Sequence, residues 1–353
     1  MAYSDIKDPS AHFQVKLWTG NATAGNTITL DGNSDMQPDW MWHKEPTDAN
    51  GWHQMDSNRG ATYVLATQST GTEYDVLSTY ISSFNSNGFT AGYGDSSINS
   101  AGVSQCSWMW HCNGGTTASN SDGSITSTVQ ANTDAGFSII TYTGTGSTAT
   151  VGHGLGVAPQ IIIGKRRNGT SNWWFGGSIL TSTQTLYPNL TNAIDNVSES
   201  VINNVTTSTT FKLGTDTNRN AASGTHVAYC FVEKQGYSKF GTYVGNGTEN
   251  NGPFVYTGFK PAFVLIKRTD SADNWFLYDT KRSPFNEADE YIRANIANAE
   301  GSNNFQIDML SNGFKTRNSG GFIGALNASG GSYIYMAFAE NPFVAGGIPT
   351  TAR

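Results

Sequence analysis

Charged side chains are scarce in this sequence. Asp, Glu, Lys and Arg make up 13% of its 353 residues, well below the roughly 25% of an average globular domain. The charge that is present has a negative excess, with a net charge of −7. Proteins that hold nucleic acid through its phosphates need clustered Lys and Arg, whereas the one basic run here, at residues 165–167, is expected to be a solvated turn. We therefore predict no nucleic-acid partner.

Cysteine and long hydrophobic runs are lacking as well. Cys106, Cys112 and Cys230 form an odd and sparse set, unlike the dense, even sets that cross-link small secreted proteins. No apolar run approaches the roughly twenty residues that span a membrane, and no secretory signal is visible. We expect a protein with no membrane partner, made in a cytoplasm and used as part of a larger assembly.

Glycine and aromatic residues are abundant instead. The chain has 40 Gly, together with 9 Trp, 15 Tyr and 18 Phe. Many short strands joined by turns require such a glycine content, and long disordered chains are poor in aromatic residues. The sequence therefore predicts folded β-domains with a polar but largely uncharged surface.

A repeated hairpin organises the chain. In each of three copies, a proline is followed six residues later by a lysine and fourteen residues later by a tryptophan. The prolines are Pro38, Pro159 and Pro261, the lysines Lys44, Lys165 and Lys267, and the tryptophans Trp52, Trp173 and Trp275. In the second copy, a β-branched run at residues 161–163, the Asn168-Gly169 turn signal and an aromatic run at residues 173–175 are typical of two antiparallel strands joined by a tight turn.

Further strands recur on both sides of this hairpin. An alternating or aromatic strand precedes it at residues 13–18, 137–142 and 237–243. An aromatic strand closes each copy, at residues 106–110, 226–231 and 333–338. Each copy thus spans about one hundred residues, enough for a two-sheet sandwich that closes its own core.

We therefore predict an all-β chain of three tandem, jelly-roll-like β-sandwich repeats. One short helix is expected in the third repeat, at residues 286–300, where Ala and Glu are frequent. The predicted parts are an N-terminal arm at 1–12, a first repeat at 13–112, a linker at 113–136, a second repeat at 137–234, a third repeat at 235–343 and a C-terminal tail at 344–353.

Tryptophans are the main candidate contact residues. Trp52, Trp173 and Trp275 recur at fixed offsets, which is typical of a packing position in a repeated core, and we interpret them as core anchors of the repeats. A second set alternates with Met41 and Met109, so one side of each strand needs a cover outside its own core. This cover is either another unit or another chain, and we predict that the set contacts a protein partner or, as an alternative, a glycan. Its members are Trp40, Trp42, Trp108 and Trp110.

No catalytic, cofactor-binding or metal-ligating residue is predicted. His153 stands between two glycines and is expected to be a turn histidine. A group of His43, His53, His111 and Cys112 lacks the spacing of a zinc site. The carboxylates that glycoside cleavage would use are expected in solvated turns. They are Glu73, Asp75, Asp270, Asp273 and Asp279.

Three stretches carry a family resemblance. They are DGSITSTV from Asp122, GFSIITYTGTG from Gly136, and VGHGLGVAP up to Pro159, which continues into IIIGKR. These residues resemble a repeat of virion structural proteins in tailed bacteriophages, particularly marine podoviruses and cyanophages. The first and third copies depart from it, because residues 36–38 and 256–261 stand in place of the His-Gly-Leu-Gly segment. The resemblance implies a tail fibre, an appendage or a capsid decoration protein, and it brings no catalytic residues with it.

The expected function follows from this resemblance. It is that of a non-enzymatic structural protein, assembled in the host cytoplasm into the virion, with other virion proteins as partners. Analogy with other phage fibres and decorations implies a homo-oligomer such as a trimer. Two alternatives stay open: a receptor- or glycan-binding module of the tail, and a glycan-degrading tail spike, which would need two carboxylates facing each other across a cleft. No cofactor is expected.

Overall fold

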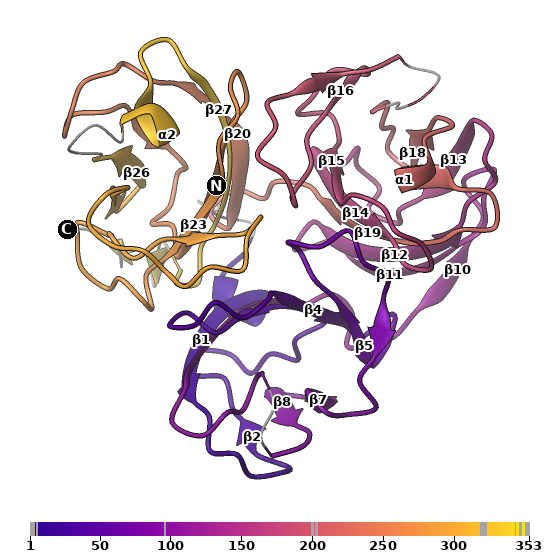
Figure 1. Ribbon diagram of the computed structural model, residues 1–353, viewed down its shortest axis with the longest axis horizontal. Helices are drawn as coiled ribbons and strands as arrows, with labels where there is room; N and C mark the ends of the chain where they lie inside the picture. Colours follow the sequence, from indigo (N-terminus) through magenta and orange to yellow (C-terminus); the bar gives the residue numbers. More distant parts are fainter. Residues whose placement is uncertain are drawn as a thin grey trace.

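Three lobes packed around a common centre make up the molecule (Figure 1). The computed structural model describes residues 4, 6–94, 97–198, 201, 204–317 and 323–342, and the backbone of residues 344–345 and 348–349. In this part of the chain nearly every element is an antiparallel strand, which confirms the predicted all-β class. None of the helices found there is long and apolar enough to cross a membrane.

The first unit, indigo to purple in Figure 1, is a sandwich of a large and a small sheet. Its large sheet contains, in spatial order, β1 (Phe13–Thr19), β9 (Ser104–Trp110), β3 (Trp40–Lys44), β4 (His53–Asp56), β5 (Gly60–Leu65) and β6 (Tyr74–Asp75). Its small sheet contains β2 (Thr27–Ile28), β8 (Gly88–Ala91) and β7 (Ile81–Asn85). Met41, Met55, Met109 and Phe89 belong to the apolar core between them.

The second unit has a large sheet of six strands. They are β10 (Ala118–Asn120), β11 (Ser127–Asn132), β12 (Phe137–Thr143), β19 (Thr225–Phe231), β14 (Ile161–Arg166) and β15 (Trp174–Gly176). The smaller elements are the pair β13 (Ala149–Gly152) and β18 (Thr210–Leu213), the pair β16 (Gln184–Thr185) and β17 (Asp195–Asn196), and helix α1 (Thr217–Asn220). Ile162, Trp174 and Phe211 belong to the core of this unit.

The third unit, orange to yellow in Figure 1, repeats the two-sheet arrangement. Its large sheet contains β20 (Ser238–Val244), β27 (Ser332–Phe338), β22 (Phe263–Arg268), β23 (Trp275–Asp279) and β24 (Ile292–Arg293). Its small sheet contains β21 (Phe254–Tyr256), β26 (Gly313–Thr316) and β25 (Ile307–Leu310), and helix α2 (Ile323–Asn327) follows it. Val255, Phe276 and Phe314 belong to the core of the third unit.

The same four strands occupy the same places in all three large sheets. The opening strand pairs with the closing strand, and the closing strand pairs with the first strand of the hairpin, in the orders β1-β9-β3-β4, β12-β19-β14-β15 and β20-β27-β22-β23. The predicted hairpins are confirmed by the antiparallel pairs β3 with β4, β14 with β15, and β22 with β23. The recurrence seen in the sequence is therefore a recurrence of sheet topology.

Both faces of these large sheets are buried. In β3, Met41 faces the core of the first unit, whereas Trp40 and Trp42 face a cluster to which all three units contribute. This central cluster lies between the three large sheets and contains residues such as Phe137, Phe231 and Phe338. The closing strands and the first hairpin strands are buried on both sides, because each has one core on either face.

Two segments have a different structure from the one predicted. The predicted linker at 113–136 includes β10 and β11, which extend the large sheet of the second unit because Ile125 and Val129 are buried in that unit's core. The helix predicted at 286–300 is wrong. That segment forms β24 and isolated bridges from Ala288 to Ile307 and from Tyr291 to Gly301. The short helix of the third unit is α2 instead.

The described residues near the N-terminus contact the third unit. The described part of the arm at 1–12 contains the 3-10 helix η1 (Pro9–Ala11) and packs Ile6 into the central cluster. The Ser4 hydroxyl donates to the carbonyl of Gln235 at 2.9 Å, and the His12 ring packs on Tyr237 with centroids 5.8 Å apart. The arm thus docks on its own chain. Near the other end, β28 (Val344–Ala345) pairs with β29 (Ile348–Pro349).

Candidate functional site: the junction of the three units

The four tryptophans predicted as partner or glycan contacts lie in the central cluster. Trp40, Trp42, Trp108 and Trp110 are between 0 and 3% exposed. Trp40 stacks on Trp110 with centroids 4.5 Å apart and on Tyr229 of the second unit at 4.3 Å. Of the two covers that were predicted, another unit or another chain, the first is the one observed, because the other two units of the same chain cover these side chains. Their assignment to an external partner or glycan is therefore wrong.

The three tryptophans interpreted as repeat anchors connect the units in a cycle. The indole of Trp173 in the second unit donates to the carbonyl of Ala66 in the first, at 2.9 Å. That of Trp275 in the third unit donates to Tyr187 in the second at 3.1 Å, and that of Trp52 in the first donates to Ile296 in the third at 3.0 Å. All three belong to the central cluster. They anchor the junction between units and not the interior of a single sandwich.

The three repeated lysines are buried beside these tryptophans. Burial lowers the pKa of Lys44, Lys165 and Lys267 to about 8 in each case. Lys165 Nζ donates across the junction to the carbonyl of Thr70 at 3.1 Å, and Lys267 Nζ donates to Thr191 at 3.0 Å. Lys165 was expected in a solvated turn; it is instead fully buried, because carbonyl groups of two units converge on its ammonium.

Backbone hydrogen bonds close the same cycle. The amide of Ser171 donates to Thr70 O at 3.0 Å, that of Asp273 to Thr191 O at 2.8 Å, and that of Glu300 to Pro46 O at 2.7 Å. In each bond, one partner lies in the loop that precedes a hairpin tryptophan, and the other partner lies in a neighbouring unit. The loop residues are Ser171, Asp273 and Pro46. The three units therefore meet along equivalent seams.

Buried charges at the first seam bind the first unit to the second. Arg59 forms ion pairs with Asp56 at 2.5 Å and with Glu73 at 2.7 Å. Arg167 of the second unit pairs with the other oxygen of Glu73 at 2.7 Å. The hydroxyl of Tyr229, also from the second unit, donates to Asp56 Oδ2 at 2.7 Å. Glu73, which had been weighed as a catalytic carboxylate, is thus held in a structural network.

The seam between the third and first units repeats this chemistry. Arg282 pairs with Asp279 at 2.7 Å and with Glu300 at 3.1 Å, and the Trp108 indole of the first unit donates to Asp279 Oδ2 at 3.1 Å. The second unit has Gly177 and Leu180 at the corresponding positions, and Leu180 belongs to the central cluster. Two seams are therefore polar at this point, while the third is apolar.

The remaining carboxylates weighed for catalysis each have a local partner. Asp270 pairs with Arg268 at 3.0 Å, and Asp75 accepts the amide of Leu77 at 2.8 Å on the surface of the first unit. Burial raises the pKa of Asp273, whose carbonyl accepts from Lys267 Nζ at 2.9 Å. These residues thus stabilise turns and the seams between units.

A cavity of about 360 Å³ between the first and third units does bring two other carboxylates together. Glu290 and Glu300 line it, together with Trp18 and Arg282. Burial and the neighbouring Glu300 raise the pKa of Glu290. The sequence reasoning missed this pair because both residues were assigned to the helix at 286–300; their ten-residue separation gave no signal of proximity.

The histidines are held by local structure. His153 is fully buried, and its Nδ1 accepts the amide of Leu155 at 3.2 Å in the turn after β13. His43 and His53 stack with centroids 5.9 Å apart inside the first unit, and burial lowers the pKa of both. Among the described residues, no group of three or more His, Cys, Asp or Glu side chains is arranged to hold a metal ion.

Comparison with known proteins gives one family. The family model described as a domain of unknown function (DUF7483) matches residues 8–342. This match begins just before η1 and ends just after β27, so one family model covers all three units and their junction. No curated protein matches the chain.

Proposed function

The chain belongs to the DUF7483 family, and from this premise we propose that it is a non-enzymatic structural protein of a tailed-phage virion. Its place is a tail fibre, an appendage or a capsid decoration, and its partners are other virion proteins. The phage assignment rests on the resemblance of residues 122–174 to virion repeats. The mode of action, through shape and protein contacts, rests on the junction of the three units.

The junction is the observation that carries the structural role. Three sandwiches share one aromatic core, and equivalent hydrogen bonds of the Trp52, Trp173 and Trp275 indoles join them in a cycle. A closed cycle of buried contacts resists hinge motion between units, since opening any one seam exposes part of the common core. A body of this kind keeps its outer surfaces in fixed relative positions, which is what a part of a particle requires.

Large apolar side chains on the outer surface are available for partner proteins. Leu77 in the first unit is 77% exposed, and Val157 in the second is 53% exposed. Scattered residues of this kind suit several small contacts that add through multivalency better than one large interface. Assembly into a homo-oligomer is part of the proposal, although the tryptophans first assigned to such contacts are covered within the chain.

Purified particles of a phage that encodes this chain test the proposal. We expect mass spectrometry to find the chain at a fixed copy number, and we expect virion density to contain a three-lobed body at a repeated position. The neighbours in that density would identify the fibre, appendage or shell. A chain that is absent from purified particles and remains a free monomer in the lysate would contradict the structural role.

Glycan cleavage is the second candidate function, and the cavity with Glu290 and Glu300 is the observation that favours it. Two carboxylates that line one cavity, of which Glu290 has a raised pKa, resemble the acid and base of a glycosidase. Arg282, however, neutralises Glu300 at 3.1 Å, as a structural ion pair does. Release of reducing ends from host polysaccharide by the purified chain, abolished by Glu290→Gln, would establish this function; no release would remove it.

A further inference from the structure

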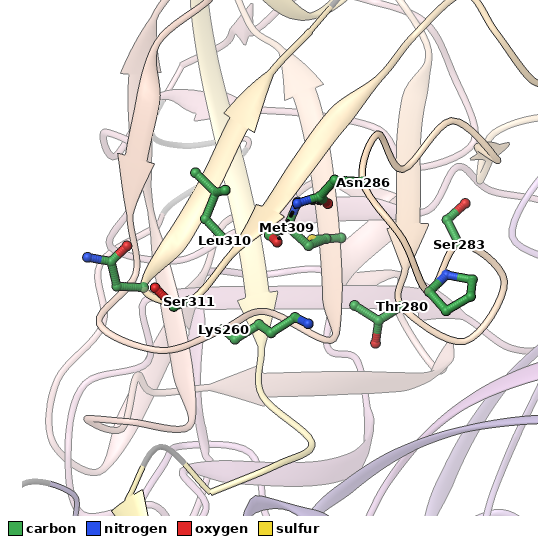
Figure 2. A pocket seen from close by; sticks show the side chains of 9 residues that line it. Lys260, Thr280, Ser283, Asn286, Met309, Leu310 and Ser311 are labelled. Carbon is green, nitrogen blue, oxygen red and sulfur yellow. Dashed lines mark hydrogen bonds between the residues drawn. The ribbon is translucent and has the colours of Figure 1, made fainter. Parts of the chain in front are cut away.

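A polar pocket lies in the third unit, lined by residues of that unit alone (Figure 2). Its volume is about 270 Å³, near the lower end of the range for small-ligand pockets (roughly 300 Å³ upward). Three segments form it: the loop after β21, the loop after β23 and the β25–β26 turn. Figure 2 shows Thr280 and Ser283 on one side and Ser311 on the other, with Lys260 between them.

Hydroxyl and amide groups dominate the lining of this pocket. Thr280, Ser283 and Ser311 supply hydroxyls, and Asn286 and Asn312 supply amides. Lys260 is the only charged residue among the nine that line it. Such a lining matches a ligand that is itself rich in hydroxyl groups and carries little charge.

The amide of Asn286 fixes one wall of the pocket. Its Nδ2 donates to the carbonyl of Met309 at 3.1 Å, and its Oδ1 accepts the amide of Met309 at 2.8 Å. The amide of Glu290 donates to Ser283 Oγ at 3.2 Å, so the hydroxyl proton of Ser283 remains available as a donor. The polar groups are thus positioned before any ligand arrives, which lowers the entropic cost of binding.

Exposed aromatic rings stand beside the pocket. Phe285, between lining residues Pro284 and Asn286, is 70% exposed. On the opposite side, Tyr256 is 57% exposed, and the next residue, Thr257, donates its amide to Asn312 O at 3.0 Å. Phe254, two residues earlier on β21, is 46% exposed. Side chains two residues apart on a strand share a face, so Phe254 and Tyr256 form an aromatic row that leads to the pocket.

We propose that this pocket and its aromatic row bind a saccharide chain. A sugar ring has an apolar C–H face and an edge of hydroxyls. The first matches the faces of Phe285 and Tyr256, and the second matches the hydroxyls and amides of the pocket. A protein partner would also cover exposed rings, but it has no need of five hydroxyl and amide side chains in a small recess.

The aromatic residues of this site are not repeated at the positions compared in the other units. Phe285 follows its hairpin proline by 24 residues, and at the same distance the other units carry Thr62 and Thr183. Tyr256 lies on β21, whereas the short strand β13 of the second unit, ATVG, has no aromatic residue. The third unit is therefore specialised, and this inference goes beyond the structural role of the junction.

Calorimetric titration of the full chain with a panel of soluble hexaoses tests the proposal. The probes are maltohexaose, cellohexaose, laminarihexaose, xylohexaose and mannohexaose, each at millimolar concentration. We expect at least one to bind, and Phe285→Ala and Tyr256→Ala each to weaken that binding about tenfold. Ser311→Ala should weaken it by a smaller factor, because one hydrogen bond to a neutral ligand is worth less than a stacked ring.

Tyr93→Ala is the matched control, because Tyr93 has the same 70% exposure as Phe285 but lies in the first unit. It should leave the binding constant unchanged, and all variants should unfold at the denaturant midpoint of the unaltered chain. If none of the five probes binds, or if Phe285→Ala and Tyr256→Ala bind as well as Tyr93→Ala, the proposal is overturned. A blank panel leaves the virion role standing, since that role is tested on particles.

Discussion

Burial sets the chemistry of single titratable side chains in this protein. It lowers the pKa of the three junction lysines to about 8, that of His53 to about 4 and that of His226 to about 3. Each shift disfavours the charged form in the folded state. The lysines remain charged near pH 7, where carbonyl groups stabilise the ammonium, whereas the two histidines stay neutral.

The substitution His226→Phe should remove part of the acid sensitivity of folding. His226 is fully buried and stacks on Tyr142 with centroids 5.0 Å apart, a contact that Phe retains. Its folded pKa of about 3 lies below the unfolded value, so the unfolded chain binds a proton first as the pH falls below about 6.5, and stability is lost. Between about pH 7 and about pH 5, the variant should gain roughly 2 kcal/mol over the unaltered chain. Urea unfolding at both pH values measures this, and parallel pH profiles would refute it.

The substitution Arg59→Leu should destabilise the chain by about 3–5 kcal/mol, because it leaves Asp56 as a buried carboxylate without its ionic partner. The double variant Asp56→Ala/Arg59→Leu should recover at least half of that loss. The apolar Leu180 at the corresponding position of the second unit indicates that an apolar seam is compatible with this architecture. Urea unfolding of the two single variants and the double variant measures the coupling, and simple additivity would contradict it.

Single strands and hairpins could be predicted closely from the sequence, because offsets between Pro, Lys and Trp repeat. The strands predicted at residues 13–18 and 137–142 are β1 and β12, with one further residue each. The helix at 286–300 could not be excluded: Ala288, Tyr291, Ile292 and Asn295 are buried at helical spacing. Their backbone groups nevertheless pair with distant partners such as Ile307 and Gly301, and local propensity does not report such contacts.

Trp173, which directly precedes β15, and Trp174, the first residue of β15, offer a test of the seam between the first and second units. Trp173 faces the junction and donates to Ala66 O, whereas Trp174 faces the interior of the second unit. Trp173→Phe should cost about 2–4 kcal/mol, since it removes the indole–carbonyl hydrogen bond to Ala66 and leaves a cavity behind. It should also speed hydrogen exchange of the Ser171 and Glu73 amides, which donate across this seam. Trp174→Phe should destabilise the unit without that local effect; equal exchange in both variants would argue against a seam held by Trp173.

At the scale of the whole molecule, the sequence predicted three units but not their shared core. Alternation of Trp40 and Trp42 with Met41 indicated two covered faces; another unit or another chain could supply the cover, and the residues were assigned to a partner or a glycan. The alternation of residues within one strand indicates that a face is buried, but it does not indicate which part of the molecule or which partner covers that face. The saccharide pocket was missed for a related reason, because its walls come from three segments that only the fold brings together.

The shared core predicts that the units do not fold separately. Excision of the third unit, residues 235–343, would expose the junction side of its large sheet, including Phe263, Trp275 and Phe338. We expect this fragment to bind a hydrophobic dye and to lack a cooperative unfolding transition. The full chain should unfold in one transition, with a denaturant dependence that matches its whole length. Cooperative unfolding of the isolated fragment, or three separate transitions of the full chain, would refute a common core.

The covalent continuity of the three lobes has one more consequence. Three separate chains joined in this way would dissociate on dilution, because each would lose its neighbours to free solution. Here the peptide chain keeps every lobe within reach of the other two, so the local concentration of each stays constant however dilute the sample becomes. The lobes can also differ from one another, as the polar and apolar seams do, without any need to keep three identical copies in register.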